Sequence, residues 1–145
     1  DIMCANYNHV LANPPYIKAN QGQVPANAAK AMATVEGRAS LIDWLNFCLN
    51  MAAPTGTVTL VHRYDRLAEI LDYLGKKNDQ ISIMPLIPKI GSEPKRVLVQ
   101  VTKGRNRGIS RVTGLILHET ERKYTPAAEA VLRHAKPVFF VGAKK

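Results

Sequence analysis

The residues most able to do chemistry in this sequence are Asn13, Pro14, Pro15 and Tyr16, which follow a short apolar run. An amino group on a planar π system is a poor nucleophile, because its lone pair is delocalised. Two acceptors, one for each N–H, can hold such a nitrogen toward tetrahedral geometry. Asn13 supplies a side-chain carbonyl, and Pro14 supplies a backbone carbonyl on a chain with fixed φ. We therefore predict that they orient an amine by positioning and electrostatic preorganisation.

Tyr16 adds an aromatic ring on which a planar base could stack, and Pro15 lies between that ring and the predicted acceptors. We predict catalytic roles for Asn13, Pro14 and Tyr16, and substrate contact for Pro15. The alternative is a strand followed by a rigid turn with no chemistry, since Asn-Pro-Pro turns also occur by chance.

The apolar residues 7–12 predict a buried parallel strand in front of this corner. Pro14 and Pro15 cannot donate ladder hydrogen bonds, so strand pairing should end near Asn13. The corner would then lie at the carboxyl end of a strand, which is the edge where open α/β sheets bind ligands.

The rest of the chain alternates between helical and extended patterns. Ser40 and Asp43 predict a capping box for a helix over residues 41–52, and residues 57–62 predict a strand. Asp65 is a candidate cap for a helix over residues 67–74, which Gly75 would end. Residues 80–84 and 96–102 predict strands, residues 85–94 a loop, residues 112–117 an extended segment, and residues 125–134 a helix. This succession favours an α/β sheet that closes in an antiparallel pair.

Charge is spread unevenly along the 145 residues, whose length predicts a single domain over residues 1–145. Residues 1–85 carry seven Lys or Arg and seven Asp or Glu, whereas residues 86–145 carry thirteen against four, which is the whole net charge of +9. The asymmetry indicates a polyanion partner for the second half, with a solubilising surface as the alternative.

Basic residues cluster around the last predicted strands and their turns: Lys89, Lys95, Arg96, Lys103, Arg105, Arg107 and Arg111. If they share a face with the corner, they could hold RNA phosphates while the corner receives a base. We predict substrate contacts for Lys95, Arg96, Lys103, Arg105 and Arg107.

Several function classes find no support in the sequence. No apolar run reaches the length of a membrane span, and no signal-peptide pattern opens the chain. Cys4 and Cys48 lack metal-ligand spacing and are expected to be reduced thiols in a cytoplasmic protein. We therefore expect no membrane partner and no metal.

The Asn13-Pro14-Pro15-Tyr16 corner resembles the Asn-Pro-Pro-Tyr motif of class I S-adenosylmethionine (SAM)-dependent methyltransferases that modify planar amino groups. Residues 44–45, 56–63, 95–100, 117–119 and 124–126 are similar to one branch, the bacterial tRNA(valine) adenine N(6)-methyltransferases. The resemblance implies the C-terminal half of a Rossmann-like class I methyltransferase sheet, with mostly parallel strands, helices and an antiparallel end. It also implies SAM as cofactor, tRNA as partner and the 6-amino group of an adenine as substrate.

The sequence departs from that family in its cofactor-binding half. It contains no strand followed by a Gly-x-Gly-x-Gly turn, and Asn8 stands where an aspartate commonly precedes the motif strand. We expect an incomplete, C-terminal part of a methyltransferase domain that is inactive alone. SAM would be bound mainly by residues outside this chain, with Asn13 beside its methionine moiety.

Two other functions stay open. Glutamine methyltransferases of translation release factors share the Asn-Pro-Pro-Tyr motif and even the following Ile17. A non-catalytic RNA-binding remnant would keep the basic second half without the cofactor half.

Overall fold

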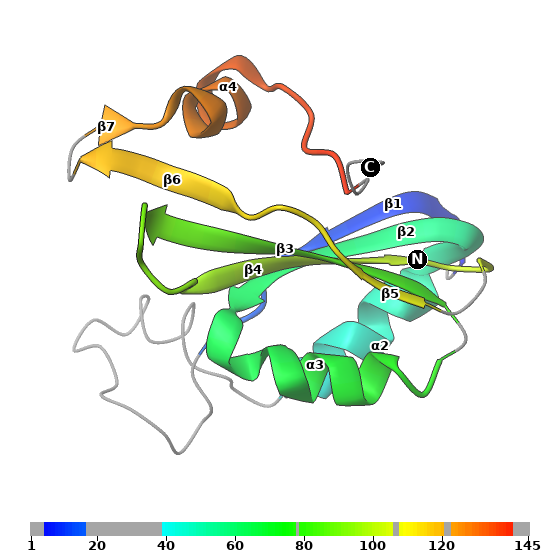
Figure 1. Ribbon diagram of the computed structural model, residues 1–145. Helices are drawn as coiled ribbons and strands as arrows, with labels where there is room; N and C mark the ends of the chain where they lie inside the picture. Colours follow the sequence, from blue (N-terminus) through cyan, green and yellow to red (C-terminus); the bar gives the residue numbers. More distant parts are fainter. Residues whose placement is uncertain (1–4, 17–38, 78, 106–107, 121–122, 141–145) are drawn as a thin grey trace.

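The computed structural model describes residues 5–16, 39–77, 79–105, 108–120 and 123–140. A seven-stranded sheet forms its centre (Figure 1). The strands are β1 (Tyr7–Ala12), β2 (Ala52–Arg63), β3 (Gln80–Lys89), β4 (Arg96–Thr102), β5 (Gly108–Arg111), β6 (Leu115–Thr120) and β7 (Lys123–Tyr124). The helices are α2 (Leu41–Met51), α3 (Leu67–Leu74) and α4 (Pro126–His134), with the 3-10 turn η1 (Tyr64–Arg66) before α3.

The sheet is mixed, with its strands in the order β1-β2-β4-β3-β6-β7 and with β5 also pairing β3. β1 pairs β2 in parallel, and β3 pairs β5 and β6 in parallel. β4 lies antiparallel between β2 and β3, and β7 is antiparallel to β6. The α/β class is thus correct, and most strands are parallel as expected, because β1, β2, β3, β5 and β6 run in one direction and only β4 and β7 are reversed. The expectation that antiparallel pairing is confined to the end of the sheet is wrong, because β4 lies inside it. β4 follows β3 through a short turn, returns alongside it and fills the position between β2 and β3.

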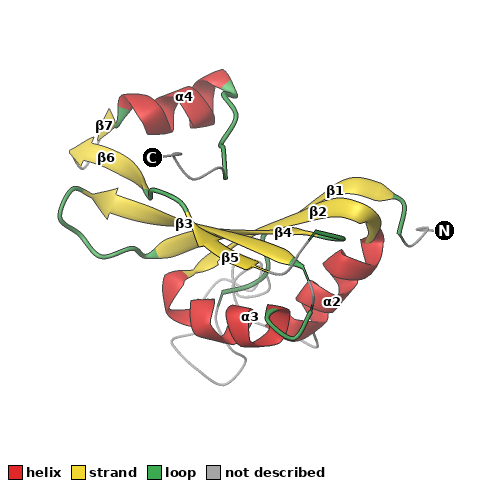
Figure 2. Cartoon of the chain, turned by 45° about the vertical axis from the view of Figure 1, so that its right-hand side comes forward, coloured by secondary structure: helices red, strands yellow, loops and turns green. Residues whose placement is uncertain are grey.

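Helices α2 and α3 cover one face of the sheet, and α4 lies over β6 on the other side (Figures 1 and 2). Alternate residues of β2 and β4 point into the α2–α3 layer, where Val58, Leu60, Val97 and Val99 are at most 1% exposed. The predicted capping box forms, because the Ser40 hydroxyl accepts from the Asp43 N–H while the Asp43 carboxylate accepts from the Ser40 N–H. Thr125 caps α4, whose predicted bounds are confirmed within a residue.

Two local predictions are wrong. Asp65 does not cap α3, because its carboxylate binds the Arg63 guanidinium and the chain enters the helix through η1. The loop predicted over residues 85–94 begins only after Lys89, because β3 continues through Pro85 to that residue. Pro85 lies between Ile83, which pairs β5, and Leu86, which pairs β6, so the strand changes neighbour where the proline lacks its N–H.

β1 is less buried than the sequence predicts. Its pairing with β2 is parallel, as expected, but Tyr7 is 47% and Leu11 is 81% exposed. Within the described residues β1 pairs on one side only and forms an edge of the sheet. Tyr7 and Leu11 therefore face outward, whereas Val10 and Ala12 of the same run pack against the core.

Gly56 allows β1 and β2 to approach closely, because a Cβ at this position would lie 2.9 Å from the Tyr7 carbonyl oxygen and 3.0 Å from the Asn8 carbonyl oxygen. These are backbone atoms, so the strands themselves would have to shift. We expect Gly56→Ala to lower the free energy of unfolding by about 1–3 kcal/mol. Urea denaturation measures this, with the exposed neighbour Thr55→Ala as control. Equal midpoints for wild type and Gly56→Ala would contradict this reading of the strand contact.

Candidate active site at the carboxyl end of strand β1

The predicted corner forms directly after β1. Asn13 is exposed, Pro14 is buried, and Pro15 and Tyr16 are half-buried. Ala12 pairs Leu60, which lies near the carboxyl end of β2. The corner therefore leaves the sheet at the edge where these two parallel strands both end. The corner thus lies at the edge expected for a ligand site in an α/β sheet.

Tyr16 turns back onto the corner, where its hydroxyl donates a hydrogen bond to Asn13 Oδ1. The contact shows that the Asn13 amide oxygen is oriented to accept a hydrogen bond. An amide oxygen has two lone pairs, so Asn13 Oδ1 can accept a second hydrogen bond beside the one from the Tyr16 hydroxyl.

His62 lies directly beneath the corner and is fully buried. Its Nε2 donates to the Pro15 carbonyl over 3.2 Å. Its ring meets the Tyr16 ring edge-on, with centroids 5.4 Å apart and an interplanar angle of 82°. His62 is not among the residues for which the sequence predicts a catalytic or substrate-binding role. The feature that could have indicated a role in the site is its position at the ligand-binding end of β2, on the inward face that also carries Val58 and Leu60.

Positive charge lies beside the corner. The register places Arg63 opposite Arg96, and the Arg96 guanidinium carbon lies 5.5 Å from the centre of the Tyr16 ring. Arg63 is engaged by Asp65, and this hydrogen bonding holds the pKa of the Asp65 carboxyl below its usual value. Lys95 and Arg96 are both exposed. Of these two predicted substrate contacts, Arg96 lies beside the corner, and Lys95 directly precedes Arg96 in the sequence.

Lys103 and Arg105 do not join them. β4 runs from Arg96 to Thr102, so these two residues follow its far end, roughly 23 Å away at a strand's rise per residue. The Lys103 ammonium donates to the Leu49 carbonyl at 2.8 Å and the Ala52 carbonyl at 2.7 Å, at the end of α2. The condition that the basic residues share one face with the corner is not met by this pair. Arg107 lies outside the described residues.

Lys103 therefore caps the carboxyl end of α2. We expect Lys103→Met to lower the free energy of unfolding by about 1.5–3 kcal/mol, because two carbonyls lose a charged donor. The change should leave RNA binding by the folded protein unaltered. Calorimetry and filter binding test the two halves of this expectation, with Arg105→Met as control. Unchanged stability together with weakened RNA binding would instead identify Lys103 as a substrate contact.

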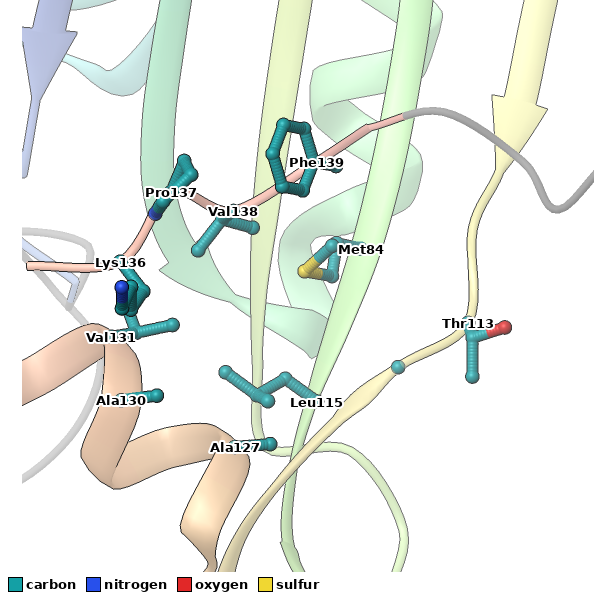
Figure 3. Close-up of a pocket in the computed structure, with 11 residues that line it drawn as sticks. Met84, Thr113, Leu115, Ala127, Ala130, Val131, Lys136, Pro137, Val138 and Phe139 are labelled. Carbon is teal, nitrogen blue, oxygen red and sulfur yellow. The ribbon is translucent and has the colours of Figure 1, made fainter.

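A hollow of about 290 Å³ borders the corner and is lined by Leu11, Ala12, Asn13, Thr59, Val61 and Leu98. A second hollow of about 290 Å³ lies between α4, β6 and the segment after α4 (Figure 3). Its walls are mainly apolar, with Met84, Leu115, Val131 and Phe139 around it. Its lining contains no carboxylate and no side-chain amide.

The described residues also bear on metal binding, membrane spanning and thiol chemistry. No group of three or more His, Cys, Asp and Glu side chains among them could hold a metal ion. None of the helices in these ranges has the length and hydropathy needed to cross a membrane. Cys48 is a free thiol whose burial raises its pKa, as expected of a reduced core cysteine. Cys4 lies outside the described residues.

No protein-family model matches the sequence, and no curated protein does. The structure is similar to a predicted O-methyltransferase from Agrobacterium tumefaciens, with a TM-score of 0.65 and 24% identity over 88% of this chain and 51% of that chain. A complex of M1.HpyAVI with SAM aligns at a TM-score of 0.41, with 13% identity over 83% of this chain and 62% of that chain, which is too distant for any argument. The chain thus spans about half the length of the first of these proteins, and it has an α/β methyltransferase-like fold.

Proposed function

We propose that this chain is the acceptor-binding part of a SAM-dependent methyltransferase that acts on the 6-amino group of an adenine in RNA. tRNA is the proposed substrate, and the cytoplasm is the proposed location. The observation that carries the proposal is the Asn13–Tyr16 corner at the ligand-binding edge of a methyltransferase-like sheet.

The chain's own residues hold the amine. One N–H of the substrate donates to the second lone pair of Asn13 Oδ1, beside the Tyr16 hydroxyl, and the other donates to the Pro14 carbonyl. When bound, SAM supplies an electrophilic methyl group that leaves its sulfonium as the new nitrogen–carbon bond forms. The nitrogen gains positive charge in that step, which two carbonyl oxygens stabilise, and it then loses one proton to water.

The described residues fit only part of SAM. Asn13 borders the hollow beside β1 and can contact the methionine moiety. The sequence has no Gly-x-Gly-x-Gly turn after a strand to approach the cofactor closely. The free edge of β1 and its exposed Leu11 fit pairing with a further strand. We propose that residues outside this chain bind there and hold most of SAM.

Lys95 and Arg96 favour RNA over the side chain of a protein substrate. Both are exposed cations, and Arg96 lies over the Tyr16 ring, so phosphates beside a flipped base could reach them. A base that stacks on Tyr16 would therefore lie close to a positive charge. A release-factor glutamine would need neither cation.

A labelled-methyl assay with the full-length protein that contains this chain tests the proposal. We expect transfer to unmodified tRNA, and none to tRNA whose target adenine already carries a 6-methyl group. Transfer to a release factor but not to tRNA would establish the glutamine alternative. RNA binding without SAM binding would establish the non-catalytic remnant.

A further inference from the structure

We infer that His62 is a positioning residue, whose imidazole holds the Asn13–Tyr16 corner in the geometry that receives the amine. The inference rests on the proposed function and adds a residue from a different strand to the site.

The middle of the corner cannot be anchored by backbone donors, because Pro14 and Pro15 have no N–H. These two residues can be tied to the sheet through hydrogen bonds only at their carbonyl oxygens. The Pro14 carbonyl is the proposed substrate acceptor, which leaves the Pro15 carbonyl for anchoring. His62 Nε2 donates to that oxygen over 3.2 Å.

His62 is itself held rigidly. It belongs to the row of inward-facing residues with Val58 and Leu60, and it pairs Val97 of β4 across the ladder. Since its side chain is fully buried, the donor is fixed relative to the sheet and the corner is fixed relative to the donor.

The hydrogen bond also fixes the tautomer. A carbonyl oxygen can only accept, so Nε2 must carry a hydrogen, and the neutral ring is the Nε2–H form. This assignment is independent of any methyl transfer and can be measured on the protein without substrate.

The same ring places the aromatic part of the corner. Tyr16 packs edge-to-face on His62 at 5.4 Å, and its hydroxyl reaches Asn13 Oδ1 in that pose. His62 thus sets both the Pro15 carbonyl and the Tyr16 ring, and through them the direction of the Asn13 amide.

Two substitutions in the full-length protein separate positioning from packing. His62→Gln can keep an N–H donor near Nε2, whereas His62→Met fills similar volume with no donor. We expect His62→Met to lower kcat by about 10²-fold with KM for tRNA nearly unchanged, and His62→Gln to stay within about tenfold of wild type. Equal kcat losses in both variants, or a loss confined to KM, would overturn the inference.

A nitrogen-15 spectrum of the wild-type histidines, assigned with His62→Gln, supplies the readout that needs neither activity nor a stable Met variant. The Nε2–H tautomer supports the inference, and the Nδ1–H tautomer overturns it. Failure of wild-type methyl transfer together with an Nε2–H His62 would reject the proposed function alone.

Discussion

Replacing Asn13 by alanine in the full-length protein is expected to lower kcat for methyl transfer by about 10²–10³-fold, the usual effect of removing one preorganised polar group from an active site. The amide oxygen is the side-chain acceptor at the corner, and without it one N–H of the amine stays unpaired while the nitrogen becomes cationic. RNA affinity should stay within about twofold, because phosphate contacts carry most of it. Single-turnover kinetics and filter binding measure the two quantities.

Asn8→Ala is the matched control for this change. Asn8 is an exposed asparagine of the same strand, but it lies near the opposite end of β1. It should leave kcat unaltered. An Asn13→Ala enzyme with wild-type kcat would remove Asn13 from the reaction.

Replacing both Lys95 and Arg96 by alanine is expected to weaken RNA binding and flatten its dependence on salt. Losing two phosphate contacts should reduce the slope of log K against log [salt] by roughly 1.4–1.8, depending on whether the contacted RNA is single- or double-stranded. Affinities measured by filter binding across a range of salt concentrations give this slope.

Lys76→Ala with Lys77→Ala removes the same charge from the end of α3, before β3 begins at the edge opposite the corner. This control should keep the wild-type slope, and so should Arg105→Ala. Equal slopes for the Lys95–Arg96 variant and the Lys76–Lys77 variant would show that net charge alone attracts RNA.

Local chemistry was predictable from the sequence. The Ser40–Asp43 capping box, the Thr125–Pro126 helix start and the end of β1 before Pro14 depend on neighbouring residues and stereochemistry. The Asn13–Tyr16 corner was predictable for the same reason.

The arrangement of distant residues was not predictable in the same way. Arg96 and Lys103 are close in the sequence, but they lie at opposite ends of strand β4. Lys103 then meets the end of α2, a contact that no periodicity reveals. His62 became part of the site because parallel pairing of β1 with β2 brings Pro15 above it.

The burial of β1 could not be predicted from its own residues, because it depends on which segments lie beside the strand. Its apolar residues predict a strand covered on both sides, yet Leu11 is exposed at a free edge. The pattern describes the surroundings that a strand requires, and residues outside this chain are proposed to supply them here.

The most direct test of the central claim is the identity of the methylated product. tRNA methylated by the full-length protein is digested to nucleosides, and the position of the transferred methyl group is determined by mass spectrometry. The account predicts N6-methyladenosine, absent when Asn13 is alanine. A methyl group on a ribose oxygen or a ring nitrogen would contradict the proposed role of the corner.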